Sequence, residues 1–330
     1  RDKQDNIWVG TFGGGLNLLS NPESGKFKHY LHDPEDPKSI SYNLVRVMLE
    51  DSRGNFWVGT WGGGLNLMDR EKGSFTRFSP NANDPDNGIS LNIITSLFED
   101  SQGLLWIGTY GGGIDLFDPD TKRFRHYRHN ELDSTSLSDD HITSFFEDDQ
   151  RNMWVSTYGG GLNKLNRQTG KFTTYIPLAG NPNSISDYKV LHLFKEPNED
   201  YIWITTLGGG LNKFYPKQNE FQHYTTEDGL SNNNTFGMLR HTDGTYWIST
   251  NYGLTHLDPK TEEFRVFTPA DGTGGVDFSL SAFTQDASGI FYFGGSKGIT
   301  YFDPDEVVPS RIFPNLMMNQ VLIDETIIND

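Results

Sequence analysis

The sequence predicts an all-β protein: a seven-bladed β-propeller of four-stranded blades, closed into a single ring. A phrase of the form Trp-x-Gly-Thr-x-Gly-Gly-Gly-Leu recurs, with variations, along the 330-residue chain. The seven copies begin at Trp8, Trp57, Trp106, Trp154, Trp203, Trp247 and, in degenerate form, Tyr292. The successive intervals are 49, 49, 48, 49, 44 and 45 residues. A strand-rich repeat of this period is typical of propellers, in which each repeat folds into one short sheet.

The third repeat shows how the strands of one blade follow from the residue types. Its first segment is rich in β-branched and aromatic residues and ends at an Asp-Ser-Gln-Gly turn, residues 100–103, where Asp bonds the backbone and Gly accepts positive φ. A glycine loop at 111–113 and an Asp-Pro-Asp-Thr turn at 118–121 separate the later segments. The four strands are expected at residues 93–99, 104–109, 114–117 and 124–127.

The two ends of the repeat array depart from this order. The first copy begins at its tight turn, so we expect its first strand before Arg1 and expect the chain to be a piece of a longer protein. Blade 1 is then incomplete, or is completed by a strand from elsewhere in the sequence. The periodicity stops after Phe302. We assign residues 1–308 to the propeller, and residues 309–330 to a connector with the first strand of a following domain or to a ring-closing segment.

The composition argues against several classes of function. The net charge is −17, from 44 acidic and 27 basic residues, and such a field repels nucleic acid and anionic lipid. There is no cysteine and no run of about 18 apolar residues, so we expect no thiolate metal site and no membrane insertion of this segment. The sequence holds neither a His-Glu-x-x-His motif nor a Gly-x-Ser-x-Gly elbow. We predict no catalytic residue, no cofactor and no metal.

Most residues of the repeated phrase have a structural explanation. The six tryptophans are expected to pack between neighbouring blades, where their burial stabilises the core. The threonine that follows Trp-x-Gly is expected to bond an adjacent strand or loop, and the aspartate that opens each tight turn is expected to cap it. The triple glycines let the chain reverse through positive φ, and no helix follows them to make a phosphate cradle.

The residue between the threonine and the glycines is of a different kind. In chain order it is Phe12, Trp61, Tyr110, Tyr158, Leu207, Asn251 and Ser296. The loop that holds it belongs to the propeller face that also carries the interblade connectors, so four aromatic side chains occupy one arc of that face. They suit stacking on sugar rings or packing on a partner protein, or else they shield the rim of the central channel. We predict a ligand or partner site at Phe12, Trp61, Tyr110, Tyr158 and Asn251.

The pattern Glu-Asp-x-x-Gly-x-x-Trp-x-Gly-Thr-x-Gly-Gly-Gly-Leu resembles the two-component regulator propeller repeat. It stands at residues 50–65 and, with Ile for the last Leu, at residues 99–114. The resemblance covers residues 1 to about 308 in seven in-phase copies, and residues 309–330 resemble the entry into the Ig-like three-tyrosine domain that follows such propellers. It implies the periplasmic sensor region of an inner-membrane histidine kinase, hybrid or ordinary, or of a diguanylate cyclase.

The resemblance also implies a ligand and partners. We expect a non-enzymatic sensor of a glycan or oligosaccharide that signals through its own Ig-like and transmembrane domains, and that forms a homodimer. Two alternatives stay open. One is a structural or protein-interaction module without a small ligand. The other, from a different class, is a polysaccharide lyase, because propeller lyases also have repeats rich in glycine and aromatic residues.

Overall fold

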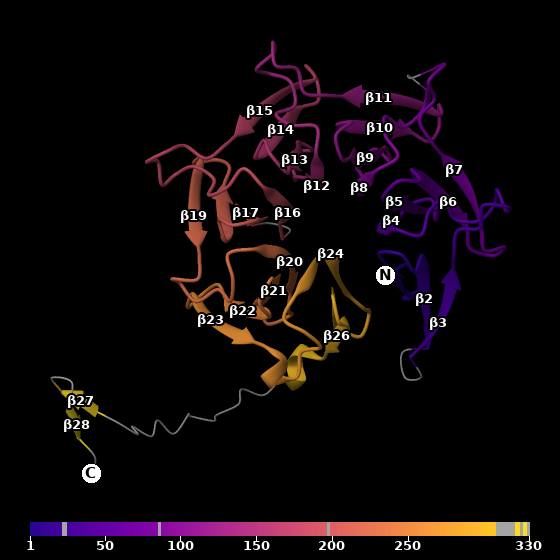
Figure 1. Ribbon diagram of the computed structural model, residues 1–330. Helices are drawn as coiled ribbons and strands as arrows, with labels where there is room; N and C mark the ends of the chain where they lie inside the picture. The colour runs from indigo at the N-terminus through magenta and orange to yellow at the C-terminus, as the bar shows by residue number, and fades with distance from the viewer. Residues whose placement is uncertain (22–24, 85–86, 197–198, 308–320, 324–325, 329–330) are drawn as a thin grey trace.

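The computed structural model is a ring of seven antiparallel sheets around a central axis (Figure 1). It describes residues 1–307 apart from 22–24, 85–86 and 197–198, together with 321–323 and 326–328 near the C-terminus. Each sheet follows the previous one around the ring in sequence order, so one repeat makes one blade. The prediction of an all-β, seven-bladed propeller is confirmed.

Five blades have four strands each, and in each blade the strands pair in sequence order. Blade 2 holds β4 (Val45–Glu50), β5 (Phe56–Thr60), β6 (Leu65–Asp69) and β7 (Ser74–Phe78). Blade 3 holds β8 (Ile94–Glu99), β9 (Leu105–Thr109), β10 (Ile114–Asp118) and β11 (Arg123–Tyr127). Blade 4 holds β12 (Ile142–Glu147), β13 (Met153–Thr157), β14 (Leu162–Asn166) and β15 (Lys171–Tyr175). Blade 5 holds β16 (Val190–Phe194), β17 (Ile202–Thr206), β18 (Leu211–Tyr215) and β19 (Glu220–Tyr224). Blade 6 holds β20 (Thr235–Arg240), β21 (Tyr246–Thr250), β22 (Leu254–Asp258) and β23 (Glu263–Phe267).

The first and last blades have three described strands each. Blade 1 holds β1 (Ile7–Gly10), β2 (Leu16–Asn21) and β3 (Lys26–Tyr30). Blade 7 holds β24 (Phe278–Gln285), β25 (Phe291–Gly295) and β26 (Gly298–Phe302). Because Trp8 stands on β1 as Trp57 stands on β5, β1 corresponds to the second strand of a complete blade. The described strands of blade 1 therefore correspond to the second, third and fourth strands of a complete blade, and those of blade 7 to the first, second and third.

The structure describes a short hairpin in the C-terminal segment. Most of residues 309–330 lies outside the described residues, and so does the predicted boundary at residue 308. In the described part, β27 (Val321–Ile323) pairs with β28 (Thr326–Ile328) as a hairpin. Its assignment to a following domain or to ring closure stays a prediction. Two short 3₁₀ turns, Pro269–Asp271 and Pro304–Glu306, lie in the last part of the ring. No helix among the described residues is long and apolar enough to cross a membrane.

The core is divided among the boundaries between blades. All six repeat tryptophans are buried, with exposed fractions of 7% or less. Each packs on the next blade: Trp57, for example, joins a cluster with Ile94 and Ile107 of blade 3, and Trp154 joins one with Val190 and Ile204 of blade 5. Six such clusters bridge six successive blade boundaries. Apolar burial of this kind holds the blades together.

Candidate functional site

The loop between the second and third strands is fixed by the threonine of the repeat. In blade 2 the Thr60 hydroxyl donates to the Gly64 carbonyl at 2.9 Å and accepts from the Gly63 amide at 3.1 Å. The same donation is made by Thr109, and the predicted bonding role of this threonine is confirmed. Gly64 has φ +78°, and a Cβ there would collide with the Phe78 carbonyl, so only glycine suits the position.

Each of these loops is held between two interblade connectors. The amides of Gly62 and Gly64 both donate to the Asn92 carbonyl, at 3.0 and 2.8 Å, in the connector that leads to blade 3. On the other side, the Trp61 amide donates to the Leu44 carbonyl at 2.8 Å, just before the first strand of its own blade. The backbone that carries the aromatic residue is therefore bonded on both sides, and its side chain is presented from a rigid support.

Three of the predicted aromatic residues form one continuous strip, here called the aromatic strip: Trp61, Tyr110 and Tyr158. The ring centroids of Trp61 and Tyr110 are 5.0 Å apart, and those of Tyr110 and Tyr158 are 6.4 Å apart. Trp61 and Tyr158 are half-buried, whereas 37% of Tyr110 is exposed. The strip crosses blades 2, 3 and 4, which are consecutive in the ring (Figure 1).

The structure does not bring Phe12 and Asn251 into this strip. Phe12 is 76% exposed, and among the described residues no ring contact joins it to Trp61. Its backbone instead bridges to Leu44 of blade 2. Asn251 is exposed on blade 6, on a separate arc, next to Tyr252, which is 54% exposed. The site predicted from sequence is therefore divided, and three of its five residues stay together.

Residues of the connectors belong to the site as well, and the sequence analysis missed them. The His141 ring lies 4.4 Å from the Tyr110 ring, edge-on, and the Lys189 ammonium lies 5.7 Å from the Tyr158 centroid. Two further tyrosines, Tyr42 and Tyr188, are 42% and 47% exposed. A signal for them was present: each of these four residues follows the recurring connector serine within three positions.

The polar surroundings of the aromatic strip are mixed in charge. Asp139 Oδ1 accepts from the His141 backbone amide at 2.8 Å and from His141 Nδ1 at 3.1 Å. Lys189 adds a cation beside Tyr158. Among the described residues, no group of three or more His, Asp and Glu side chains is placed to hold a metal ion. The strip thus offers aromatic faces with nearby donors and acceptors, an arrangement that suits an uncharged polyhydroxyl ligand or a protein surface.

The comparisons with known proteins agree with this architecture. A family model described as "two component regulator propeller" matches residues 39–62, 88–111 and 136–159. The extracellular domain of the putative hybrid two-component system BT3049 from B. thetaiotaomicron is similar at TM-score 0.78 and 24% identity, over 100% of this chain and 43% of that one. The extracellular domain of the putative one-component system BT4673 from the same organism gives 0.58 and 24%, over 93% and 41%.

Two more distant similarities complete the comparison. "Histidine kinase P4" of Formosa agariphila is 23% identical over 96 residues, which are 29% of this chain and 7% of that protein. Virginiamycin B lyase of Staphylococcus aureus shares the fold at TM-score 0.63 and 11% identity, over 91% of each chain. The matched part of this chain spans less than half the length of the BT3049 and BT4673 domains and of the histidine kinase.

The fold and the loop chemistry define a β-propeller whose blades are joined by hydrogen-bonded glycine loops. The matched segments each run from a connector through the first two strands into the glycine loop, so they cover the residues that build this chemistry. Repeats 2, 3 and 4 thus match the two component regulator propeller model, and the whole chain shares the propeller fold of the BT3049 extracellular domain.

Proposed function

We propose that this propeller is the extracytoplasmic, ligand-binding part of a two-component sensor, and that its aromatic strip binds a sugar ring. The observation that carries the proposal is the continuous stack of Trp61, Tyr110 and Tyr158 on loops whose backbone is bonded on both sides. A rigid aromatic surface binds with little loss of conformational entropy. The similar domains of BT3049 and BT4673 are described as extracellular parts of signalling systems, which supports the same location here.

The ligand class follows from the charge and from the side chains around the strip. With a net charge of −17, the protein repels heavily sulfated or otherwise polyanionic glycans. His141, Asp139 and Lys189 supply hydrogen-bonding groups at the edge of the aromatic faces. A neutral or weakly charged oligosaccharide fits both features. Binding would bias a dimer or an interdomain arrangement, and the signal would pass through an Ig-like domain to a membrane-anchored output domain.

A second candidate is a protein-interaction propeller that has no small ligand. The exposed rings of Phe12, Tyr42 and Tyr188 favour it, because they extend the apolar surface beyond what one sugar ring covers. A polysaccharide lyase is a third candidate, favoured only by the contact between the Tyr110 and His141 rings, two side chains that can exchange protons. The similarity to virginiamycin B lyase concerns the fold and carries no argument for that activity.

A glycan array followed by calorimetry on the soluble chain tests the proposal. Trp61→Ala combined with Tyr110→Ala should weaken glycan binding at least tenfold, because each stacking contact contributes about 1 kcal/mol or more. Tyr252→Ala is the matched control: it removes an exposed ring from the equivalent loop of blade 6 and should leave the affinity unchanged.

Three results would redirect the proposal. Equal binding by the double variant would remove the aromatic strip as the site. Dimerisation through this face without any glycan binding would favour the interaction module. Release of unsaturated oligosaccharides from a bound polymer would favour the lyase.

A further inference from the structure

The connector between blades 4 and 5, residues 176–189, differs from the other connectors at one position. Tyr188 stands where the connectors that lead to blades 2, 3, 4 and 6 have Asn43, Asn92, Asp140 and Asn233. The backbone keeps the common role, because the Tyr188 carbonyl accepts from the Gly161 amide at 2.9 Å as the Asn92 carbonyl accepts from the Gly64 amide. The side chain is therefore what sets this connector apart.

A proline explains why the fold tolerates a tyrosine there. In three other connectors, the side-chain Oδ1 at this position accepts from the backbone amide two residues after the preceding strand. The pairs are Asn43 with His32, Asp140 with His129 and Asn233 with Thr226, at 2.7, 2.7 and 2.9 Å. In the connector to blade 5 the corresponding residue is Pro177, which has no amide hydrogen. No acceptor is needed at position 188, so its side chain is free of that structural task.

The side chain at position 188 instead adds to an exposed apolar surface. Tyr188 Oη lies 3.5 Å from the Pro177 carbonyl, so the tyrosine side chain extends toward the start of the connector. Ile176 and Leu178, on either side of Pro177, are 37% and 52% exposed. We call Ile176, Leu178 and Tyr188 the connector patch. Apolar side chains left in water contribute little to folding stability, so stability does not explain the patch.

The connector patch is continuous with the aromatic strip. Lys189 follows Tyr188 in the chain and places its ammonium group 5.7 Å from the Tyr158 centroid, at the end of the strip nearest blade 5 (Figure 1). On the other side of Tyr188, Asp187 Oδ1 accepts from the Lys189 amide at 2.8 Å. An ammonium group and a carboxylate therefore accompany the exposed tyrosine, as His141 and Asp139 accompany Tyr110.

From these observations we infer that the connector patch is a further sugar subsite, and that the ligand is a linear oligosaccharide extending from the aromatic strip across Tyr188. A tyrosine face suits the apolar side of a pyranose ring, and the charged groups of Lys189 and Asp187 suit its hydroxyl groups. A short sugar occupies the strip alone, whereas a longer chain also reaches the patch. The inference rests on the proposed function and deepens it, because it states the size and shape of the glycan.

The test measures affinity against chain length. Calorimetry on the soluble 330-residue chain uses cello-, manno- and xylo-oligosaccharides, each from the monosaccharide to the hexasaccharide. In a series that binds, affinity should rise about fivefold at the length that reaches Tyr188, the gain expected from one stacking contact. Tyr188→Asn should abolish this rise and leave the affinity for the shortest bound sugar unchanged, because the aromatic strip is intact.

Three variants separate the two subsites. Tyr188→Asn installs the residue found at this position in three other connectors, so circular dichroism and Tm should match those of the native chain. Tyr188→Phe keeps the ring and should keep the rise in affinity with length. Trp61→Ala combined with Tyr110→Ala should weaken the binding of every length, because it removes the strip that all of them share.

Each failure has a distinct signature. The same rise with chain length in Tyr188→Asn as in the native chain would overturn the inference and leave the aromatic strip as the site. Binding by no glycan of the array and by none of the three series would overturn the proposed function and this inference together. A dimer that Tyr188→Asn dissociates would assign the connector patch to a second copy of this chain instead.

Discussion

At the residue scale, the aspartate that opens the tight turn has two roles: its carboxylate caps the turn and it also binds the indole N–H of the repeat tryptophan. Asp51 Oδ1 accepts from the backbone amides of Arg53 and Asn55, at 3.0 and 2.8 Å, and closes the tight turn. Asp51 Oδ2 accepts from Trp57 Nε1 at 2.9 Å and fixes the ring that packs on the next blade. Equivalent bonds join Asp2 to Trp8, Asp100 to Trp106 and Asp148 to Trp154. The predicted capping role of these aspartates is confirmed, and the indole bond adds to it.

Removing one of these carboxylates should therefore be more damaging than losing a turn cap. We expect Asp51→Ala to lower the free energy of unfolding by about 3 kcal/mol, because it leaves a buried indole N–H and two amides without an acceptor. Asp243→Ala is the control, since Asp243 caps the corresponding turn of blade 6 through the Thr245 amide but is largely exposed. That change should cost less than about 1 kcal/mol. Equal losses in urea titrations would contradict the double role.

His192 makes the fold sensitive to acid. Its ring lies between Ser144 of blade 4, at 3.3 Å, and the Phe283 ring of blade 7, at 5.0 Å. Although part of the residue stays accessible, burial of the ring lowers the pKa of His192 from 6.5 to about 4. A lowered pKa in the folded state favours the neutral form, so this contribution to stability is complete above pH 6.5 and declines as the pH falls toward 4.

The size of this effect can be measured against a variant without the imidazole. Between pH 7 and pH 4.5, the native protein should lose about 2 kcal/mol more of its unfolding free energy than His192→Gln. Urea titrations at both pH values, made on both proteins, give the difference. The same acid sensitivity in the variant would show that the lost stability comes from other groups.

At the scale of the element, the sequence predicted the strands well and the site only in part. For the third repeat we expected strands at residues 93–99, 104–109, 114–117 and 124–127. These bounds differ from those of β8–β11 by one residue at most at either end. Local patterning determines such strands, because apolar alternation and turn residues lie within one repeat. The aromatic strip depends on packing between blades, and no pattern inside one repeat shows that His141 contacts Tyr110 or that Phe12 stands apart.

A glycine-to-alanine substitution, which adds one methyl group, tests the geometry of the glycine loop. Gly64 combines φ +78° with a site where a Cβ would collide with the Phe78 carbonyl, whereas Gly170 has φ +70° and open space around it. Gly170→Ala should cost about 1 kcal/mol for the left-handed conformation alone. Gly64→Ala should cost about 2–3 kcal/mol, because strain at this loop adds to that conformational cost. Denaturant melts of both variants compare the two positions, and similar losses would show that the loop relaxes freely.

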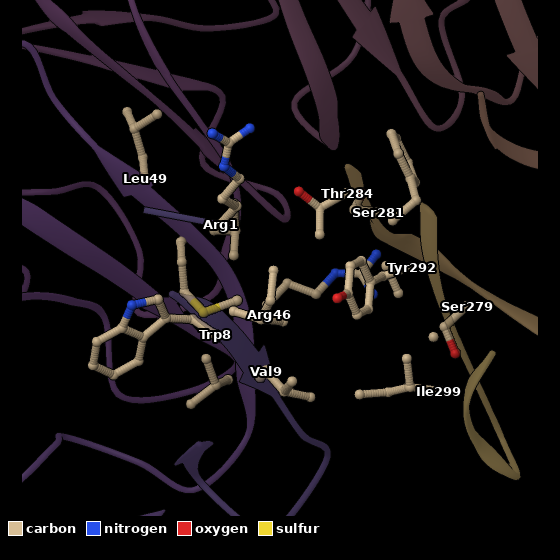
Figure 2. A pocket seen from close by; sticks show the side chains of 18 of the residues that line it. Arg1, Trp8, Val9, Arg46, Leu49, Ser279, Ser281, Thr284, Tyr292 and Ile299 are labelled. Atoms are coloured by element: carbon tan, nitrogen blue, oxygen red, sulfur yellow. The ribbon is translucent and has the colours of Figure 1, made fainter. Parts of the chain in front are cut away.

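At the scale of the whole molecule, the ring is held unevenly. Six boundaries are closed by apolar clusters around a buried tryptophan, and each cluster also ties one blade to the next. Between blades 7 and 1 the described residues form two hydrogen bonds, from the Ala287 amide to Asp5 and from Arg1 to the Gln285 carbonyl, beside a cavity (Figure 2). In a repeat array, stability is close to a sum of terms for each repeat and for each interface, so a weak interface lowers the stability of the blades beside it.

Hydrogen exchange should show this difference directly. Amides of β1, β2, β25 and β26 should exchange through openings about 3 kcal/mol less costly than those that expose β9 and β13, because no apolar cluster of described residues joins blade 7 to blade 1. Native-state exchange followed by mass spectrometry resolves the blades, and those in the middle of the array serve as the internal control. Equal protection of all seven blades would mean that the boundary between blades 7 and 1 is as stable as the apolar boundaries, despite the cavity beside it.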